Sequence, residues 1–309
     1  MTGSEAQRRW LVVGARGMLG TDLVDVLTTG GENVTGLGRD GLDIRDPAAC
    51  RRAVAGHDVV VNAAAYTAVD DAETHEAEAF AVNAVGAANL ARACARAAAR
   101  LIHISTDYVF NGMSATEPSV SPYAEDSPLG PHSAYGRTKA AGEWAVRAEH
   151  DDVLLLRTAW LYGAHGRCFP RTIAAALATR DVLDVVDDQL GQPTWTRDVA
   201  GLMLALVRAD ALPGTYHATS QGMTSWHGFA QQVAVAVGAD PERVRPTTSE
   251  ALHRAAPRPP FSVLAHTTLL SEVLRERGVA PIGDWRERFT EAAPEVLAGA
   301  GDQPPSRRD

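Results

Sequence analysis

The feature that most constrains the fold is an apolar segment followed at once by three regularly spaced glycines. Trp10–Val13 is apolar, Gly14, Gly17 and Gly20 follow in a GxxGxxG pattern, and an amphipathic segment continues to about Thr29. In a strand–turn–helix unit the first glycine permits the tight turn, the second lets a pyrophosphate approach the backbone, and the third lets helix pack on strand. The chain holds 27 glycines, so the position between strand and helix carries more weight than the spacing. The pattern predicts a dinucleotide-binding turn with an anion at the helix N-terminus.

Apolar segments alternate with helical ones through the first half of the chain. The further predicted strands are 33–37, 58–62, 101–104 and 153–157. The predicted helices are 76–99 and 133–150, the second with Ser133 as its N-cap. Such alternation predicts an α/β fold with a doubly wound parallel sheet (Rossmann), which binds ligands at the carboxyl ends of its strands.

The regular alternation breaks after Gly163. A loop rich in turn-forming residues spans 187–194, a helix with Thr196 as a possible N-cap runs to 208, a strand at 214–219 returns to the sheet, and Ser225 precedes a helix to about 237. The second half is predicted to form a smaller, partly interleaved C-terminal α/β substrate domain. The predicted division is a flexible tail at 1–9, a dinucleotide-binding domain at 10–163 with 196–220 returning to it, a substrate domain from 164–195 and 221–298, and a flexible tail at 299–309.

Thr106, Tyr135 and Lys139 form the predicted catalytic group. Thr106 follows the apolar strand, while Tyr135 and Lys139 lie four residues apart and share one helix face. A phenol with a pKa of about 10 is a weak proton donor at neutral pH, and a nearby ammonium is expected to lower that pKa. The Thr106 hydroxyl is expected to hydrogen-bond the carbonyl oxygen of a substrate. Together the three residues predict that this oxygen receives a proton from Tyr135 while a hydride is transferred to the carbonyl carbon. The same spacing arises by chance in many helices, so the rest of the chain must support this interpretation.

The end of the second strand bears on the choice of nicotinamide cofactor. A site selective for the ribose 2′-OH carries an acidic residue there, whereas this chain has Gly38-Arg39. The Arg39 guanidinium either pairs with the 2′-phosphate of NADP or is a solvated charge. We predict NADPH as the cofactor, with NADH still usable. Asn83, a polar residue on an apolar helix face, either ties two strands together or belongs to the surface.

Composition excludes several classes of protein. The net charge of -9 argues against nucleic-acid binding, which needs clustered basic residues, so an anionic substrate requires local cations. Cys50, Cys94 and Cys168 are scattered, which indicates neither a disulfide framework nor a zinc site. The pair Asp187-Asp188 fits a solvated turn, so no metal is predicted. No apolar run has transmembrane length and 1–9 lacks a signal-peptide core, so we expect a cytoplasmic protein without membrane partners.

Seven motifs spread over nearly the whole chain occur together. They are GxxGxxG at 14–20, NAAAYTAVDDAE at 62–73, STDYVFNG at 105–112, YGRTKAAGE at 135–143, RTAWLYG at 157–163, DQLGQPT at 188–194 and RPPFSVL at 258–264. Together they resemble the extended short-chain dehydrogenase/reductases, and within them the dTDP-4-dehydrorhamnose reductases and related NDP-4-keto-6-deoxysugar 4-reductases. Several such motifs in one chain are far more specific than any one alone.

The resemblance implies roles for individual residues. It makes Thr106, Tyr135 and Lys139 catalytic. The expected cofactor-binding residues, with Arg39 added from the argument above, are Gly14, Gly17, Met18, Leu19, Gly20, Arg39, Asp43, Ile44, Ala65, Tyr66, Thr67, Tyr135 and Lys139. The expected substrate-binding residues are Val69, Thr106, Asp107, Tyr135, Trp160 and Arg258. Trp160 would stack on the sugar, although the residue pattern alone would place it in the core.

The resemblance further implies an NAD(P)H-dependent reductase acting on C4 of an NDP-4-keto-6-deoxysugar, such as dTDP-4-dehydrorhamnose, as a monomer or homodimer. Two departures from the family pattern are Gly38, where some members have an acidic residue, and Cys168-Phe169, where relatives often have Asn-Phe. A 4-epimerase or 4,6-dehydratase is the enzymatic alternative, but a dehydratase usually has Asp-Glu where this chain has Asp107-Tyr108. The other alternative is an NAD(P)-binding regulatory subunit without catalysis. Some relatives bind Mg at a dimer interface, which nothing in this sequence requires.

Overall fold

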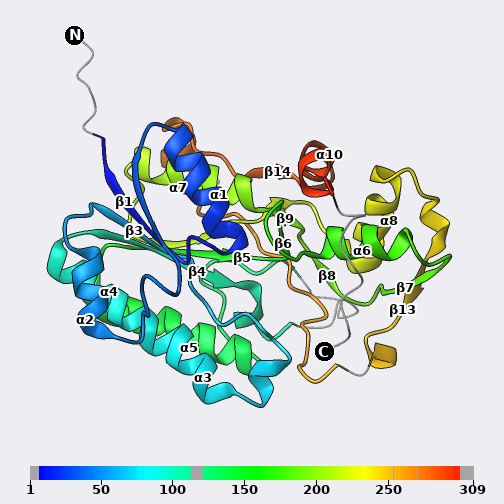
Figure 1. Ribbon diagram of the computed structural model, residues 1–309, viewed down its shortest axis with the longest axis horizontal. Coiled ribbons are helices and arrows are strands. Elements are labelled where there is room, and N and C mark those ends of the chain that lie inside the picture. The colour runs from blue at the N-terminus through cyan, green and yellow to red at the C-terminus, as the bar shows by residue number, and fades with distance from the viewer. Residues whose placement is uncertain (1–6, 113–120, 253, 270, 300–309) are drawn as a thin grey trace, which may run out of the picture.

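The computed structural model describes residues 7–112, 121–252, 254–269 and 271–299, and a parallel sheet of six strands lies at its centre (Figure 1). The strands are β1 Arg9–Val13, β2 Asn33–Leu37, β3 Val59–Asn62, β4 Arg100–Thr106, β5 Val153–Thr158 and β10 Gly214–His217. Their order across the sheet is β10-β5-β4-β3-β1-β2, and every neighbouring pair is parallel. The predicted doubly wound α/β fold is confirmed, including the returning strand at 214–219.

Helices cover both faces of the sheet. On one face lie α1 (Met18–Thr29) and α7 (Thr196–Arg208), and on the other lie α2 (Pro47–Val54), α4 (Ala87–Ala97) and α5 (Ala134–Glu149) (Figure 1). Successive strand residues point to opposite faces, so Trp10 and Val12 pack under α1 and α7 while Leu11 and Val13 pack under α2 and α4. Burial on both faces explains why these strands are almost continuously apolar.

The predicted helix 76–99 is continuous but not uniformly α-helical. It consists of α3 (Glu76–Phe80), a π-helical segment at Ala81–Gly86, and α4. Two close approaches occur at this segment. A side chain at Gly86 would meet Ile44 at 2.6 Å, and one at Gly142 of α5 would lie 2.2 Å from the Asn83 carbonyl oxygen. The wider turn therefore sits where the helix is pressed against its neighbours, a feature that the apolar periodicity does not reveal.

The second half builds a smaller body beside the sheet (Figure 1). Its helices are α6 (Phe169–Leu177), α8 (Trp226–Ala236) and α10 (Trp285–Val296), whereas the short α9 (Glu272–Glu276) packs against the core under the sheet. Its strand pairs are β6 (Leu161–Tyr162) with β9 (Thr194–Trp195), β7 (Leu183–Val186) with β13 (Val244–Thr247), β8 (Leu190–Gly191) with β12 (Thr224–Ser225), and β11 (Ser220–Gln221) with β14 (Ile282–Asp284). Single 3₁₀ turns occur at Asp71–Glu73, Asp107–Val109, Pro241–Arg243 and Glu250–Leu252. Tyr162, Phe229 and Phe289 form the aromatic centre of this body.

Several local predictions can be compared with the structure. Ser133 and Ser225 cap α5 and α8, each accepting a backbone N–H at 3.0 Å. Thr196 is not a cap: it is the first residue of α7, and its hydroxyl donates to Asp22 of α1. The predicted loop 187–194 contains β8 and the first residue of β9.

At the ends of the chain, β1 begins at Arg9, inside the predicted tail 1–9, whereas 1–6 and 300–309 lie outside the described residues. Leu269, Leu274 and Ile282 pack with α7 in the core under the sheet, so this part of the predicted substrate domain contacts the dinucleotide-binding half. In the part of the chain that the structure describes, no helix is both long and apolar enough to span a bilayer.

Candidate active site

A cleft of about 680 Å³ opens at the carboxyl ends of β1, β3, β4 and β5. It is lined by residues from both halves of the chain, among them Met18, Val69, Thr106, Tyr135, Lys139, Trp160, His165 and Trp226. A second cavity of about 460 Å³ shares Gly17, Ala63, Ala64 and Ala65 with it and extends to Arg39 and Asp43. The two cavities place the glycine-rich turn and the predicted catalytic group in one continuous groove.

The predicted catalytic residues meet in this cleft. Thr106 ends β4, and its hydroxyl donates to an Asp107 carboxylate oxygen at 2.9 Å. Tyr135 and Lys139 lie one turn apart at the start of α5, which Ser133 caps. The Lys139 ammonium is buried and donates to the Ile104 carbonyl oxygen at 2.6 Å. Burial lowers the pKa of Lys139 to about 8, although Glu143 opposes this shift.

The electrostatics of Tyr135 differ from the sequence-based expectation. We expected Lys139 to lower the Tyr135 pKa, but burial of the phenol raises it, and the Asp107 carboxylate raises it further. A hydrogen bond with Thr106 acts in the opposite direction and lowers this pKa. The Lys139 ammonium donates to the Ile104 carbonyl. Tyr135 is therefore held as a protonated phenol, the form that donates a proton.

Asp107 is an almost fully buried carboxyl at the base of the cleft. Burial raises its pKa to about 6, while hydrogen bonds with Ser262 and Thr106 lower it. The next residue, Tyr108, packs edge-on against Tyr135 with ring centroids 5.7 Å apart. Asp107 thus contacts the hydroxyl of Thr106, and Tyr108 packs against the ring of Tyr135.

The glycine-rich turn fits an anionic group. Gly14 has a positive φ of 84°, and a side chain there would lie 2.7 Å from the Ala64 backbone nitrogen. At Gly20 a side chain would lie 2.1 Å from the Gly14 carbonyl oxygen. The N-cap of α1 is Gly17, no side chain caps the helix, and its first turn holds no acidic residue. The start of this helix lines the cleft, and N–H groups at a helix N-terminus can bind an anion such as a pyrophosphate.

The second cavity carries three arginines at the end of β2. Arg39 is exposed and lines it. Arg16 also lines it and pairs with Asp40 at 2.7 Å. Arg45 pairs with Asp43 at 2.7 Å, and this contact lowers the pKa of Asp43 to about 2. Arg16 and Arg45 were not predicted as site residues. In the sequence, only their position beside predicted site residues pointed to them.

The loop after β3 is tied to the helices by Asn83. Its side chain is buried, accepts from the Tyr66 N–H at 2.8 Å, and donates to the Tyr66 carbonyl at 3.1 Å and to Thr138 at 3.0 Å. Of the two interpretations of Asn83, a structural link is correct and a surface position is not. The link joins the loop 63–67 to α5 rather than two strands. Ile44 lines the second cavity while its side chain packs in the core beside Gly86.

The aromatic wall of the cleft differs from the expectation for Trp160. Trp160 stacks on Trp226 with ring centroids 3.6 Å apart, and a side chain at Gly191 would lie 2.4 Å from its indole. The protein therefore already covers much of the ring that was expected to stack on a sugar. Trp226 lines the same cleft, and the sequence analysis missed it because nothing near it in the sequence marks a site.

Two further expected substrate residues lie apart from each other. Val69 lines the cleft. Arg258 does not line either cavity: it pairs with Asp70 at 2.7 Å and donates to the Ala256 carbonyl at 3.1 Å. Asp70 also accepts from the Ala256 N–H at 3.0 Å. Arg258 thus links the segment after β3 to the proline-rich segment of the second half.

A buried ion pair supports the catalytic helix from below. Glu143 of α5 and Arg157 of β5 form two hydrogen bonds, at 2.9 and 2.8 Å, and both side chains are buried. Ser105 donates to the same Glu143 carboxylate at 2.5 Å. A buried pair with satisfied partners fixes geometry more than it adds stability. It holds α5 against β4 and β5, which aligns Tyr135 and Lys139 with Thr106.

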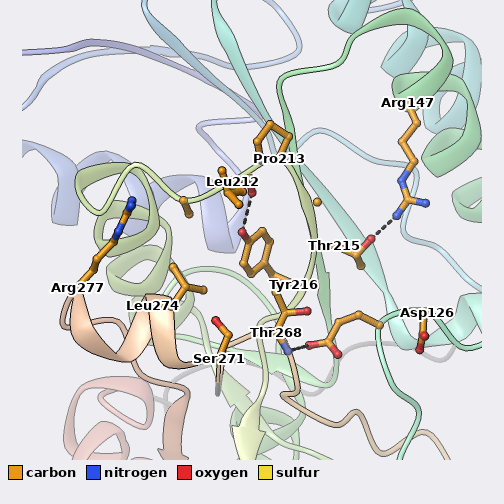
Figure 2. A pocket seen from close by; sticks show the side chains of 13 residues that line it. Asp126, Arg147, Leu212, Pro213, Thr215, Tyr216, Thr268, Ser271, Leu274 and Arg277 are labelled. Atoms are coloured by element: carbon orange, nitrogen blue, oxygen red, sulfur yellow. Dashed lines mark hydrogen bonds between the residues drawn. The ribbon is translucent and has the colours of Figure 1, made fainter.

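A cavity of about 570 Å³ lies away from the cleft, beside β10 (Figure 2). Its two arginines already have partners: Arg147 donates to Thr215, and Arg277 donates to the Ala209 and Asp210 carbonyls. It lacks the glycine turn and the tyrosine–lysine pair, so the groove at the strand ends is the candidate active site. Within the described ranges, no three His, Cys, Asp or Glu side chains are grouped to hold a metal ion.

Comparison with known proteins agrees with this geometry. The family model described as the RmlD substrate binding domain matches residues 8–297. A Streptomyces antibioticus protein named probable dTDP-4,6-dihydroxy-2-methyloxan-3-one 4-ketoreductase is 49% identical over 97% of this chain and 99% of its own. A Streptomyces griseus dTDP-4-dehydrorhamnose reductase is 48% identical over 97% and 98%. The dTDP-4-dehydrorhamnose reductase of Bacillus anthracis str. Ames, solved in complex with NADP, superposes with a TM-score of 0.85 at 32% identity, covering 94% of this chain and 99% of that one.

Proposed function

The chain belongs to the dTDP-4-dehydrorhamnose reductase family, and we propose that it uses NADPH to reduce the C4 carbonyl of a dTDP-linked 4-keto-6-deoxysugar. The observation that carries this proposal is the convergence of Thr106, Tyr135 and Lys139 in a cleft that begins at the glycine-rich turn. The names of the two Streptomyces relatives support a dTDP-linked keto-sugar as the substrate class.

The residues in the cleft suit protonation of a developing alkoxide. When bound, the nicotinamide supplies the hydride. The Tyr135 phenol donates its proton to the carbonyl oxygen, and the Thr106 hydroxyl orients that oxygen by a hydrogen bond. The Lys139 ammonium stabilises the phenolate that Tyr135 becomes, since its positive charge favours the ionised phenol in a buried site. Asp107 holds Thr106 through the bond at 2.9 Å.

The cofactor would be held along the continuous groove. The first turn of α1, with Gly17, Met18 and Leu19, would bind the pyrophosphate, and Ala65 and Thr67 would border the nicotinamide side. Arg39 and Arg16 would bind the 2′-phosphate, since both line the second cavity and guanidinium groups favour phosphate; Arg16 would do so beside its partner Asp40. Val69, Asp107 and the Trp160–Trp226 stack would face the sugar.

The two alternatives predict different behaviour. A 4,6-dehydratase needs a second acid or base after Asp107, and the residue there is Tyr108, whose pKa is raised by burial. Purified protein given dTDP-glucose and NAD should therefore yield no 4-keto product. A regulatory subunit would bind NADPH without turnover, yet the buried Lys139 and the supported α5 are features of a site organised for proton transfer.

The test is NADPH oxidation, followed by loss of absorbance, with dTDP-4-dehydrorhamnose and dTDP-4,6-dihydroxy-2-methyloxan-3-one as substrates. Turnover of at least one is expected in the wild type. Tyr135→Phe keeps the ring and removes the proton donor, so kcat should fall by roughly 10²–10⁴ with the fold intact. Tyr216→Phe is the matched control, because its hydroxyl bonds the Leu212 carbonyl outside the cleft, and its turnover should equal that of the wild type. Unchanged turnover of Tyr135→Phe would overturn the proposal.

A further inference from the structure

The wall of the cleft opposite the glycine-rich turn is a short loop after β6. His165, Gly166 and Arg167 of this loop line the same cleft as Arg16, Gly17 and Met18. Gly166 has a positive φ of 80°. The loop is anchored at its base, because Arg171 donates to the Ala164 carbonyl at 3.3 Å. Two basic side chains therefore lie across the cleft from the N-terminus of α1.

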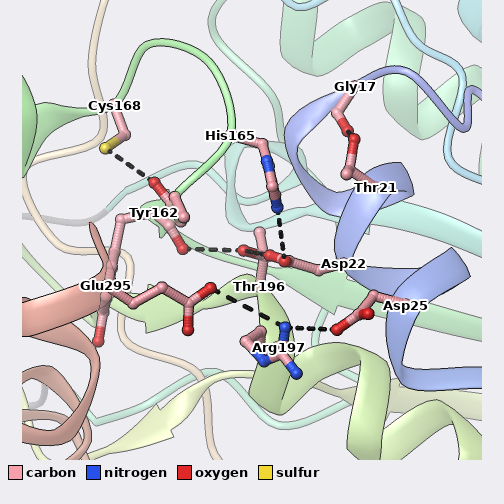
Figure 3. Close-up of polar contacts among 12 residues, drawn as sticks. Gly17, Thr21, Asp22, Asp25, Tyr162, His165, Cys168, Thr196, Arg197 and Glu295 are labelled. Carbon is pink, nitrogen blue, oxygen red and sulfur yellow. Dashed lines mark hydrogen bonds and ion pairs between the residues drawn. The ribbon is translucent and has the colours of Figure 1, made fainter. Parts of the chain in front are cut away.

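His165 is placed over a buried carboxylate. Figure 3 shows its ring directed at Asp22 of α1, with His165 Nε2 3.5 Å from Asp22 Oδ1. Asp22 is fully buried, and Oδ1 forms no hydrogen bond with the described residues. A side chain at Gly163 would lie 3.2 Å from Asp22 Oδ2, so the loop passes directly over the carboxylate.

The other groups around Asp22 are engaged elsewhere. Thr196 donates to Oδ2, which leaves Oδ1 to His165. Arg197 also faces Asp22, but its guanidinium pairs with Asp25 at 2.6 Å and lies 3.9 Å from Glu295 (Figure 3). Burial raises the pKa of Asp22, whereas Thr196, His165 and Arg197 lower it and Glu295 raises it. A buried carboxylate is costly to retain without a partner, so its contact with the cleft wall calls for a role.

We propose that His165 and Arg167 bind a diphosphate in the cleft and that Asp22 is the positioning residue that orients His165 for this contact. With Nε2 directed at Asp22, Nδ1 is the other ring nitrogen and would donate an N–H to an anion. A carboxylate behind an imidazole fixes its orientation and protonation in this way at other sites. The inference rests on the proposed function, in which both NADPH and the dTDP-sugar carry a diphosphate.

The experiment measures binding without turnover. Dissociation constants are determined for NADPH and 2′-AMP by fluorescence or calorimetry, and for dTDP and thymidine by calorimetry; 2′-AMP and thymidine lack the diphosphate. His165→Gln removes the cation, His165→Lys restores one, and Asp22→Asn removes the carboxylate charge while an acceptor remains for Thr196. His57→Gln, just before β3 at the amino ends of the strands, is the matched control. Thermal midpoints are recorded for all variants.

We expect His165→Gln to weaken dTDP or NADPH binding about tenfold, the effect of one partly exposed charge-assisted hydrogen bond, with 2′-AMP and thymidine unaffected. His165→Lys should recover most of the loss. Asp22→Asn should weaken binding of the same ligand. Combined with His165→Gln, it should cause no further loss of affinity. Loss confined to dTDP assigns the diphosphate to the substrate, and loss confined to NADPH assigns it to the cofactor; either supports the inference.

Unchanged binding of both ligands in His165→Gln overturns the inference, as does equal weakening of thymidine or 2′-AMP. An Asp22→Asn effect that adds fully to that of His165→Gln overturns the positioning role. If the wild type binds neither NADPH nor dTDP, the proposed function itself fails. This outcome distinguishes a failure of the proposed function from a failure of the inference about His165.

Discussion

At the scale of single residues, the site depends on two buried charges whose pKa values move toward neutrality. Burial lowers the pKa of Lys139 to about 8 and raises that of Asp107 to about 6. Lys139 is charged below its pKa and loses its ammonium as the pH rises through about 8. Asp107 is ionised above its pKa and becomes protonated as the pH falls through about 6. Because kcat/KM reports the free enzyme, we predict a plateau between these values with a decline on each side.

The pH profile of kcat/KM checks this, with circular dichroism at each pH as the control for unfolding. Lys139→Arg supplies a cation that stays charged throughout, so whatever its absolute rate, its alkaline decline near pH 8 should vanish. A wild-type profile that stays flat up to pH 10 would contradict the role given to Lys139.

The arginines at the end of β2 lead to a prediction on cofactor preference. Arg39 lines the second cavity, and Arg16 lies close enough that a side chain at Gly38 would be 3.0 Å from Arg16 Cδ. A charge-assisted bond to a phosphate corresponds to roughly a ten- to hundredfold preference, and exposure places it at the low end. Arg39→Ala should therefore lower kcat/KM for NADPH about tenfold and leave NADH within about twofold. The double variant Arg16→Ala/Arg39→Ala should remove the remaining preference for NADPH over NADH. A preference for NADPH that survives in both variants would make Arg39 a solvated charge.

At the scale of elements, the π-helical segment 81–86 connects the loop 63–67 to α5. Asn83→Ala leaves the half-buried N–H and carbonyl of Tyr66 without their partners. We predict a loss of about 2–4 kcal/mol in the free energy of unfolding, since an unsatisfied buried group costs about 1–3 kcal/mol and the two half-buried groups fall in the lower part of that range. KM for NADPH should rise as well, because the loop 63–67 lines the groove. Urea unfolding and steady-state kinetics measure both. Val85→Ala, an exposed residue of the same segment, is the control, and equal effects of the two variants would refute the linkage.

The secondary structure of the first half was predictable because it depends on local patterns. Strands buried on both faces are continuously apolar, and Ser133 and Ser225 cap helices through bonds three residues away. The π-helical segment was not predictable, since it arises from close approaches between Gly142 and Asn83 and between Gly86 and Ile44. Thr196 looked like a cap because the sequence does not show that Asp22, far away in the chain, accepts its hydroxyl.

The same distinction holds for the site. The residues that converge in the cleft with recognisable motifs, such as Gly17, Thr106 and Tyr135, were named from the sequence. Trp226 and His165 were missed, because they reach the cleft only through the packing of the second half against the first. Arg258 was expected there but pairs with Asp70, a contact set by the proline-rich segment.

At the scale of the whole molecule, the cleft joins the two halves, and ligands should stabilise both together. The core under the sheet contains Leu269, Leu274 and Ile282 from the second half, and Asp22 of α1 contacts Thr196 and His165. We therefore predict a single thermal transition. A ligand at 100 times its Kd adds about 2.7 kcal/mol to the stability of the native state, which for a chain of this size raises the midpoint by about 5 °C. Calorimetry should show this shift with NADPH alone and with dTDP alone. Tyr135→Phe should show the same shifts, since it removes a proton donor and leaves the binding surfaces in place. Two separate transitions, of which dTDP moves only one, would mean that the halves unfold independently and that the cleft does not couple them.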